Sequence, residues 1–202
     1  MQDKANAAAM DSTKSNSEDS VVPGISNADY VKLCGFRTEA TGSMLADLAQ
    51  KLSKARGLFD KSVINHPRMT FEPFYFFFYG SLQAQRTLMR ACRLDDPHPT
   101  LVPASIKGWR NALAKMWGQY PALVAAEGNE VKGMCWKCEK PEHVGHLRVY
   151  ETDAYRMEFC KITTEKGEVI ENGRVFVSTE PEEQLTEGSF DLAWYIDSYS
   201  NS

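Results

Sequence analysis

Residues 74–82 are Phe-Tyr-Phe-Phe-Phe-Tyr-Gly-Ser-Leu and contain the longest apolar run of the chain. Six consecutive aromatic residues are too continuous for a strand with one face in water, so the run indicates a strand buried on both faces. The run stops at Gly80, and the apolar residues from about 81 to 94 are spaced as in a helix. A strand that passes through glycine into a helix leaves free backbone N–H groups at the helix start, where an anion binds favourably.

The residues before this strand divide into two parts. Residues 1–27 contain no aromatic residue and carry a net charge of −2, from two Lys against four Asp or Glu. A segment with so little apolar mass does not offset its chain entropy, which predicts a disordered tail. Residues 28–70 are interpreted as a helical extension, with an amphipathic helix capped by Ser43 and running towards Phe59. We expect this helix to pack on the main domain; docking to a partner is the alternative.

Residues 71–202 form the predicted main domain. Its strands and helices do not alternate strictly, which indicates an α+β domain or a small barrel with peripheral helices. A helix is expected over residues 141–150, a turn at 127–130, and a hairpin around Asn172 and Gly173. The expected strands cover residues 101–111, 113–116, 120–124, 131–138, 155–163, 169–170 and 175–177.

Composition excludes several classes of protein. The 202 residues include 23 Lys or Arg and 27 Asp or Glu, a net charge of −4, which argues against binding to nucleic acid or to an anionic membrane. No apolar run is long enough to span a bilayer, and no secretory or transit signal is recognisable, so a cytoplasmic location is expected. The phosphate-binding, dinucleotide, nucleophile-elbow and zinc-protease motifs are missing. Nothing in the sequence indicates an oligomeric state.

The five cysteines are an odd number at irregular spacing, which predicts reduced thiols. Cys135 and Cys138 form a C-x-x-C pair, and His143 and His146 follow, so a zinc site is one hypothesis. Residues three apart in a strand point to opposite faces, however. We therefore prefer buried cysteines and expect neither a metal nor another cofactor.

Five short motifs occur in the order found in the γ-glutamylcyclotransferase-like family, which includes γ-glutamylamine cyclotransferase and the plant avirulence-induced proteins. Residues 78–82 resemble the family's F-x-Y-G-S/T-L opening, and residues 118–123 its G-x-Y-P-A segment. The family's V-x-G strand is matched by residues 131–134, and its L-x-x-Y/F-E helix end by residues 147–151. Its Tyr-x-Arg pair is matched in position by residues 155–156. The resemblance covers about residues 74–199, and the tail at 188–192 is similar to fungal-type members.

This resemblance implies a fold and a reaction. The fold is a small mixed β-barrel of about six strands flanked by helices, here with the N-terminal helical extension added. The reaction is of the amide-cyclising lyase or acyltransferase class: the α-amine of a γ-glutamyl substrate attacks its own side-chain amide, releasing 5-oxoproline and an amine or amino acid. Because both reacting groups belong to one small molecule, a metal-independent site needs only to fold the substrate and move a proton.

The resemblance also implies roles for particular residues. Glu151 is the implied general acid/base, and its place at a helix C-terminus is expected to raise its pKa. Asp153 is the nearest competing carboxylate. The implied substrate-binding residues are Tyr79, Gly80, Ser81 and Leu82, with Tyr120 and Tyr155 as walls of the pocket. Gly80 is expected because a ligand must approach the backbone closely.

Two features depart from the family pattern and keep an alternative function open. Arg156 is displaced by one position from the family's arginine and, in a strand, faces the other way. The front extension has no counterpart in compact members. A non-catalytic ligand-binding or interaction protein with this fold is therefore the alternative, and a zinc module on Cys135 and Cys138 is a third. A single cavity shared by Glu151 and the backbone N–H groups of residues 80–82 would favour the enzyme.

Overall fold

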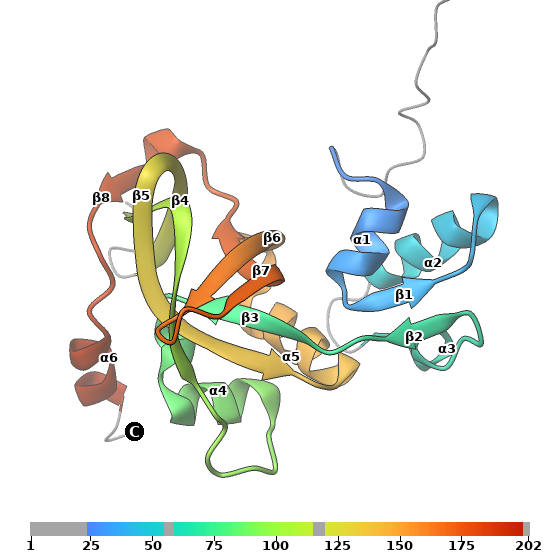
Figure 1. Ribbon diagram of the computed structural model, residues 1–202, viewed down its shortest axis with the longest axis horizontal. Helices are drawn as coiled ribbons and strands as arrows, with labels where there is room; N and C mark the ends of the chain where they lie inside the picture. Colours follow the sequence, from blue (N-terminus) through green and yellow to red (C-terminus); the bar gives the residue numbers. More distant parts are fainter. Residues whose placement is uncertain (1–23, 55–58, 115–119, 200–202) are drawn as a thin grey trace, which may run out of the picture.

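The computed structural model describes residues 24–54, 59–114 and 120–199 (Figure 1). A helical N-terminal extension lies at one side of a β-barrel, and the C-terminal helix α6 (Leu192–Tyr199) lies at the other. Residues 1–23 of the predicted tail lie outside the described residues. No helix in the described part of the chain is long and apolar enough to cross a membrane.

The extension consists of short elements around its own apolar side chains. They are α1 (Asn27–Leu33), β1 (Phe36–Thr38), α2 (Gly42–Lys54), α3 (Lys61–Ile64) and β2 (Met69–Phe71), and β1 pairs with β2 in an antiparallel ribbon. The predicted amphipathic helix corresponds to α2, which buries Leu48 and Leu52. It begins before Ser43 and ends at Lys54, short of Phe59. Residues 55–58 lie outside the described part.

The main domain is a closed barrel of five strands. β3 (Phe74–Phe78), β4 (Val102–Ala114), β5 (Pro121–Cys138), β6 (Tyr155–Thr164) and β7 (Val169–Ser178) are ordered β5-β3-β7-β6-β4, and pairing between β4 and β5 closes the ring. Only the β3–β7 pair is parallel among the described strands, so the barrel is mixed. β8 (Leu185–Glu187) adds a sixth strand along β4. This is the predicted fold class.

Helices cover the outside of the barrel. A 3₁₀ turn, η1 (Ser81–Gln83), follows β3 and leads into α4 (Gln85–Cys92), so the predicted helix begins as a tighter turn. α5 (Pro141–Glu151) matches the helix expected over residues 141–150 and packs beside α4. A second 3₁₀ turn, η2 (Thr152–Ala154), joins α5 to β6, and η3 (Glu182–Gln184) joins β7 to β8.

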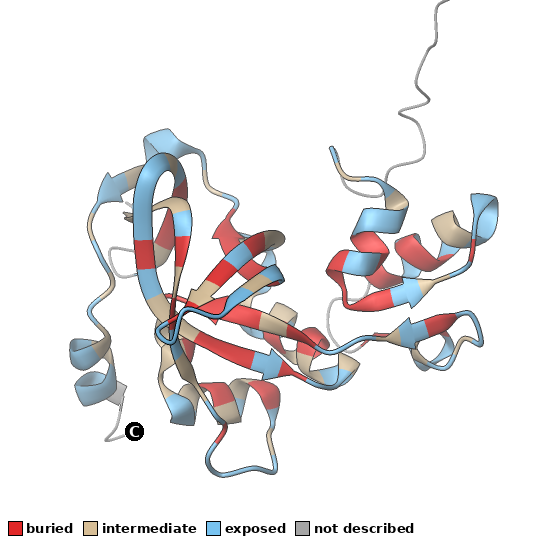
Figure 2. Ribbon diagram, viewed as in Figure 1, coloured by how far each residue is buried: buried red, intermediate tan, exposed pale blue. Residues whose placement is uncertain are grey.

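β3 is buried on both faces, as its sequence predicts. Phe74, Phe76 and Phe78 point into a core shared with the helices and the extension, whereas Phe77 packs with the interior of the barrel. Phe76 and Phe77 are 0% and 1% exposed. In Figure 2 the strand is buried over most of its length.

A predicted break between two strands and a predicted turn are instead parts of long strands. The strands expected at 101–111 and 113–116 are one strand, β4, with a register shift at Gly108, and residues 115–116 lie outside the described part. The turn expected at 127–130 falls inside β5. There the register passes from Lys107 opposite Glu130 to Trp109 opposite Ala125, so residues 126–129 loop out while pairing continues on both sides.

The predicted hairpin at Asn172 and Gly173 is wrong. Both residues lie inside β7, and the chain turns earlier, at Gly167, which has a φ of +82°. Gly173 is required for a different reason: a Cβ atom there would lie 2.4 Å from Cδ1 of Ile162 on the paired strand. A close contact between strands thus explains a glycine that the local pattern assigns to a turn.

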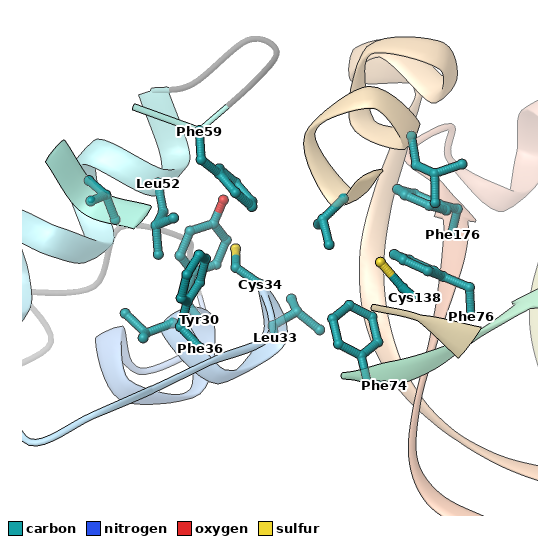
Figure 3. Packing of buried hydrophobic residues seen from close by; sticks show 14 of the residues in the cluster. Tyr30, Leu33, Cys34, Phe36, Leu52, Phe59, Phe74, Phe76, Cys138 and Phe176 are labelled. Atoms are coloured by element: carbon teal, nitrogen blue, oxygen red, sulfur yellow. The ribbon is translucent and has the colours of Figure 1, made fainter. Parts of the chain in front are cut away.

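The extension and the barrel share one hydrophobic core, shown in Figure 3. Leu33 and Cys34 from the extension face Phe74 and Cys138 from the barrel, and all four are buried. Residues 28–70 and 71–202 bury apolar side chains in the same core. The boundary between them therefore stays a prediction from the sequence.

Arg174 of β7 joins the two parts through a buried guanidinium group. The residue is 3% exposed, and its guanidinium lies 4.4 and 4.3 Å from the ring centres of Phe74 and Phe159. Its nitrogens donate to the carbonyl oxygens of Lys32 at 2.6 Å and Leu33 at 3.0 Å, at the C-terminus of α1. A cation satisfies the carbonyls that a helix leaves free at this end. Burial lowers the pKa of Arg174 to about 10.

We expect Arg174→Ala to lower the free energy of unfolding by about 3 kcal/mol, because it opens a cavity between two rings and leaves buried carbonyls unpaired. Urea unfolding followed by tryptophan fluorescence measures the loss. Arg37→Ala is the control, since Arg37 forms an exposed ion pair with Glu72 and is expected to cost less than about 1 kcal/mol. Equal losses in the two variants would contradict the structural role of Arg174.

Candidate active site

A cavity of about 470 Å³ opens where β3, β5, β7 and α5 meet. Its volume is in the range of small-molecule sites, and its wall is mostly apolar. Every site residue predicted from the sequence lines it: Tyr79, Gly80, Ser81, Leu82, Tyr120, Glu151 and Tyr155. Residues from four separate segments of the chain thus meet in one place.

Glu151 is the last residue of α5 and is half-buried in the cavity wall. Burial raises the pKa of its carboxyl from 4.5 to about 8. The expected direction of the shift is therefore found, but its cause is desolvation. A carboxyl with a pKa near neutrality both accepts and returns a proton at physiological pH.

Thr152, the next residue, has an unusual backbone conformation. Its φ of 60° and ψ of −168° lie in a region that is almost restricted to glycine. The side chain accepts a hydrogen bond from the N–H of Ala154 at 3.3 Å. This sharp turn ends α5 directly after Glu151 and sets the direction in which the chain leaves the cavity.

The turn after β3 forms the side of the cavity with free backbone donors. The N–H groups of Ser81 and Leu82 stand at the first positions of η1, where no carbonyl of the same turn accepts from them. Gly80 is needed at this point for a reason other than the predicted approach of a ligand. A Cβ atom on Gly80 would lie 2.7 Å from Cγ of Pro121, so β5 itself makes the close approach.

The tyrosines of the cavity differ in what their hydroxyl groups do. Tyr79 donates to the carbonyl oxygen of Phe176 at 2.8 Å, and Tyr155 donates to that of Pro121 at 2.7 Å. These bonds fix the two rings as walls of the cavity. Tyr120 is 57% exposed and stands at the rim.

Tyr150 also lines the cavity, although it was not among the predicted site residues. Its hydroxyl lies 2.7 Å from Oγ of Ser81, which connects the end of α5 to the turn after β3. The aromatic position before the glutamate in the matched motif was its only signal. Three further polar residues of the wall were missed because no recognisable sequence pattern marks them: Thr152, Ser178 and Glu180.

Arg156 does not reach this cavity. It faces a second cavity of about 1030 Å³ between the barrel and the extension, where it pairs with Glu158 at 2.7 Å. Because it is displaced by one residue in β6, Arg156 faces away from the candidate active site, as predicted. Asp153 also lines only the second cavity.

Cys135 and Cys138 lie in separate hydrophobic clusters, one inside the barrel and one beneath the helices. Burial raises the pKa of both thiols, to about 11 and about 12. The described residues include no group of three or more His, Cys, Asp or Glu side chains placed to hold a metal. The C-x-x-C pair therefore does not form one half of a zinc site, because its two sulfurs point to opposite faces of β5.

The closed mixed barrel, with the end of α5 beside the turn after β3, is the architecture expected for a protein of the γ-glutamylcyclotransferase type. The family model described as "Gamma-glutamyl cyclotransferase, AIG2-like" matches residues 76–194, which is more than half of the chain. The chain belongs to this family. A comparison with curated proteins finds no match.

Several solved structures are similar to this chain at low sequence identity. An Arabidopsis thaliana protein determined in solution is similar with a TM-score of 0.50 and 16% identity, over 65% of this chain and 78% of that one. A second Arabidopsis thaliana protein has a TM-score of 0.49 and 19% identity, over 65% and 86%. An AIG2-like protein from Mus musculus has a TM-score of 0.43 and 17% identity, over 59% and 88%.

The strained turn at Thr152 leads to a prediction about stability. Thr152→Gly is expected to be more stable than Thr152→Ala by about 1 kcal/mol, because glycine adopts this conformation without steric cost. Both variants lose the hydrogen bond to Ala154, so their difference reports on backbone strain, less the entropy that glycine adds to the unfolded chain. Thermal unfolding of the pair measures it, and an alanine variant that equals or exceeds the glycine variant in stability would refute the strain.

The raised pKa of Glu151 predicts how stability depends on pH. Between pH 4.5 and about 8 the unfolded chain releases this proton and the folded protein keeps it, so the folded state loses stability as pH rises through this range. Glu151→Gln removes the titration. We expect its free energy of unfolding, relative to that of the original protein, to increase from pH 5 to pH 8.5. Parallel pH profiles of the two proteins in urea unfolding would contradict the shift.

Proposed function

We propose that this protein cyclises γ-glutamyl amides, releasing 5-oxoproline and an amine or amino acid, with Glu151 as general acid/base. Membership of the family supports a γ-glutamyl cyclotransferase-like function. The observation that carries the proposal is the single cavity that holds Glu151 together with the N–H groups of residues 80–82. The substrate supplies its own nucleophile, so the site has only to position it and move one proton.

In the proposed reaction, the carboxylate of Glu151 takes a proton from the substrate's α-ammonium group. The freed amine attacks the γ-carbonyl carbon, and the carbonyl oxygen becomes negatively charged. When the bond from this carbon to the amide nitrogen breaks, Glu151 returns the proton to the departing amine. The attacking nitrogen still carries two hydrogens, and it loses one of them to the Glu151 carboxylate as the lactam forms. This second proton then passes to the released amine, which leaves as an ammonium ion, and Glu151 is a carboxylate again. A pKa of about 8 for Glu151 is close to that of an α-amino group, so neither transfer is strongly uphill.

The backbone donors have a complementary role in this proposal. The N–H groups of Ser81 and Leu82 bind an anionic group of the substrate, either its α-carboxylate or the oxygen that becomes charged. The hydrogen bond between Tyr150 and Ser81 holds these donors against the end of α5, which carries Glu151. The distance between the base and the donors is thereby fixed within the fold.

A purely ligand-binding role is favoured less. A ligand-binding role would be favoured by a cavity that the extension fills, or by a Glu151 carboxylate far from the backbone N–H groups of residues 80–82. Among the described residues, the extension contributes to the second cavity and to no part of the first. A carboxyl with a pKa near 8 is also costly for a site that only binds, and matches the needs of proton transfer.

The proposal is tested by 5-oxoproline release from γ-glutamyl amines, γ-glutamyl amino acids and glutathione. We expect Glu151→Gln to lower kcat by about 10²–10⁴-fold on any substrate that is cleaved, because proton transfer is lost. Asp153→Asn is the matched control: it removes the same charge two residues away, outside the cavity, and is expected to keep full activity.

Equal rates for the original protein and Glu151→Gln on every cleaved substrate would disprove the role of Glu151. An original protein that releases no 5-oxoproline from any substrate would disprove the proposed reaction. Circular dichroism of the three proteins shows whether a loss of activity comes from unfolding.

A further inference from the structure

The C-terminal helix α6 lies against the turn η1 of the candidate active site, although it buries little of its own surface. Among the side chains described for this helix, Leu192 and Tyr195 are half-buried and the others are exposed, Trp194 and Ile196 included. The two half-buried residues are three apart, so they lie on the same face of the helix. A short helix with so little apolar burial depends on specific contacts of this face for its place on the domain.

Tyr195 makes most of these contacts. Its ring centre lies 5.5 Å from that of Phe190, just before the helix, and its hydroxyl lies 3.5 Å from Oγ1 of Thr87 on α4. The side chain of Asp191 caps the helix by accepting a hydrogen bond from the N–H of Trp194 at 2.9 Å. The start of α6 is therefore fixed, and the phenol of Tyr195 is directed towards α4.

The same phenol forms a hydrogen bond with Tyr150, at the end of α5. Burial raises the pKa of the Tyr150 hydroxyl; a hydrogen bond with Ser81 lowers it, and the hydrogen bond with Tyr195 raises it again. The Tyr150 hydroxyl lies 2.7 Å from Oγ of Ser81. Three hydroxyl groups thus form a chain that runs from α6, through the end of α5, to the first residue of η1.

Two members of this chain adjoin the groups that the proposed reaction uses. Ser81 supplies the first free backbone N–H of η1, and Tyr150 immediately precedes Glu151. Ser81 and Tyr150 are 69 residues apart in the sequence, so their relative position depends on contacts made in the folded protein. The hydroxyl chain is such a contact.

The bond between Tyr150 and Ser81 is open to competition from water. Tyr150 is 38% exposed, and a neutral hydrogen bond contributes little net free energy where water can replace either partner. A phenol hydroxyl both donates and accepts, so a second partner fixes its orientation as well as its position. Tyr195 is that second partner, and it turns one exposed hydrogen bond into a network whose members support one another.

We propose that Tyr195 is a positioning residue for the cyclisation: through Tyr150 it holds the backbone N–H groups of η1 at a fixed distance from the carboxyl of Glu151. This inference rests on the proposed function. Donors that are already in place stabilise a developing negative charge without reorganisation, so a looser turn slows the reaction. Tyr195 lies just beyond residues 76–194, which the family model matches, and it extends the framework of the site to the C-terminal helix.

Tyr195→Phe removes the hydroxyl and keeps the ring that packs on Phe190. On a γ-glutamyl substrate that the original protein cleaves, we expect kcat/KM for 5-oxoproline release to fall about three- to tenfold, the range of one neutral hydrogen bond. The loss is a lower kcat if the backbone donors bind the charged oxygen, and a higher KM if they bind the α-carboxylate. Thermal unfolding of the variant shows whether the fold is kept.

Tyr150→Phe and the double variant test whether Tyr195 acts through Tyr150. Tyr150→Phe is expected to lower kcat/KM at least as much as Tyr195→Phe, and adding Tyr195→Phe to it should change kcat/KM by less than about twofold. Tyr75→Phe is the matched control, because it removes the hydroxyl of a half-buried tyrosine that lines neither cavity. It is expected to keep the kcat and KM of the original protein.

The outcomes separate this inference from the proposed function. Losses that multiply in the double variant would overturn the proposal, since Tyr195 would then act without Tyr150. Unchanged kcat and KM in Tyr195→Phe, with or without a lower unfolding temperature, would also overturn it and leave the cyclisation standing. An original protein that releases no 5-oxoproline from any substrate refutes the cyclisation and, with it, the role of Tyr195.

Discussion

The burial of β3 on both faces is the constraint on which the other elements depend. A strand whose alternate side chains are all apolar must have a core on each side, and the chain supplies them in different ways. Strands β4 to β7 close a barrel over Phe77, while the helices and the extension cover Phe74, Phe76 and Phe78. The strand ends where the cavity opens beside Tyr79 and Gly80.

The cavity has a largely apolar wall with few charged side chains among its described residues, and this wall accounts for the pKa of Glu151. Desolvation gives Glu151 a pKa of about 8 without the help of a neighbouring acid. The raised pKa of Glu151 thus has its physical origin in the apolar wall at the ends of β3, β5 and β7.

The sequence predicted what depends on local pattern and missed what depends on distant contacts. The aromatic run of β3 and the spacing of α5 are local signals, and matched motifs located Glu151 and Tyr79. Asn172 and Gly173 looked like a turn, but Gly173 is small because Ile162 lies against it. Glu180 carried no signal, since its place at the cavity follows from the hydrogen bonds of Thr179 to residues 153 and 154, which the chain sequence does not show.

Arg174 connects the extension to the strand β7, which forms part of the cavity wall. Side chains alternate along β7, so Arg174, Phe176 and Ser178 share a face, and a slip of one residue would turn all three to the other side. Such a slip is opposed because Arg174 has its acceptors at the end of α1. The extension therefore stabilises the register of β7, the strand that places Ser178 in the cavity wall. Ser178 lies four residues after Arg174, about 13 Å along the strand. A segment whose described residues line no part of the candidate active site thereby helps to align one of its walls.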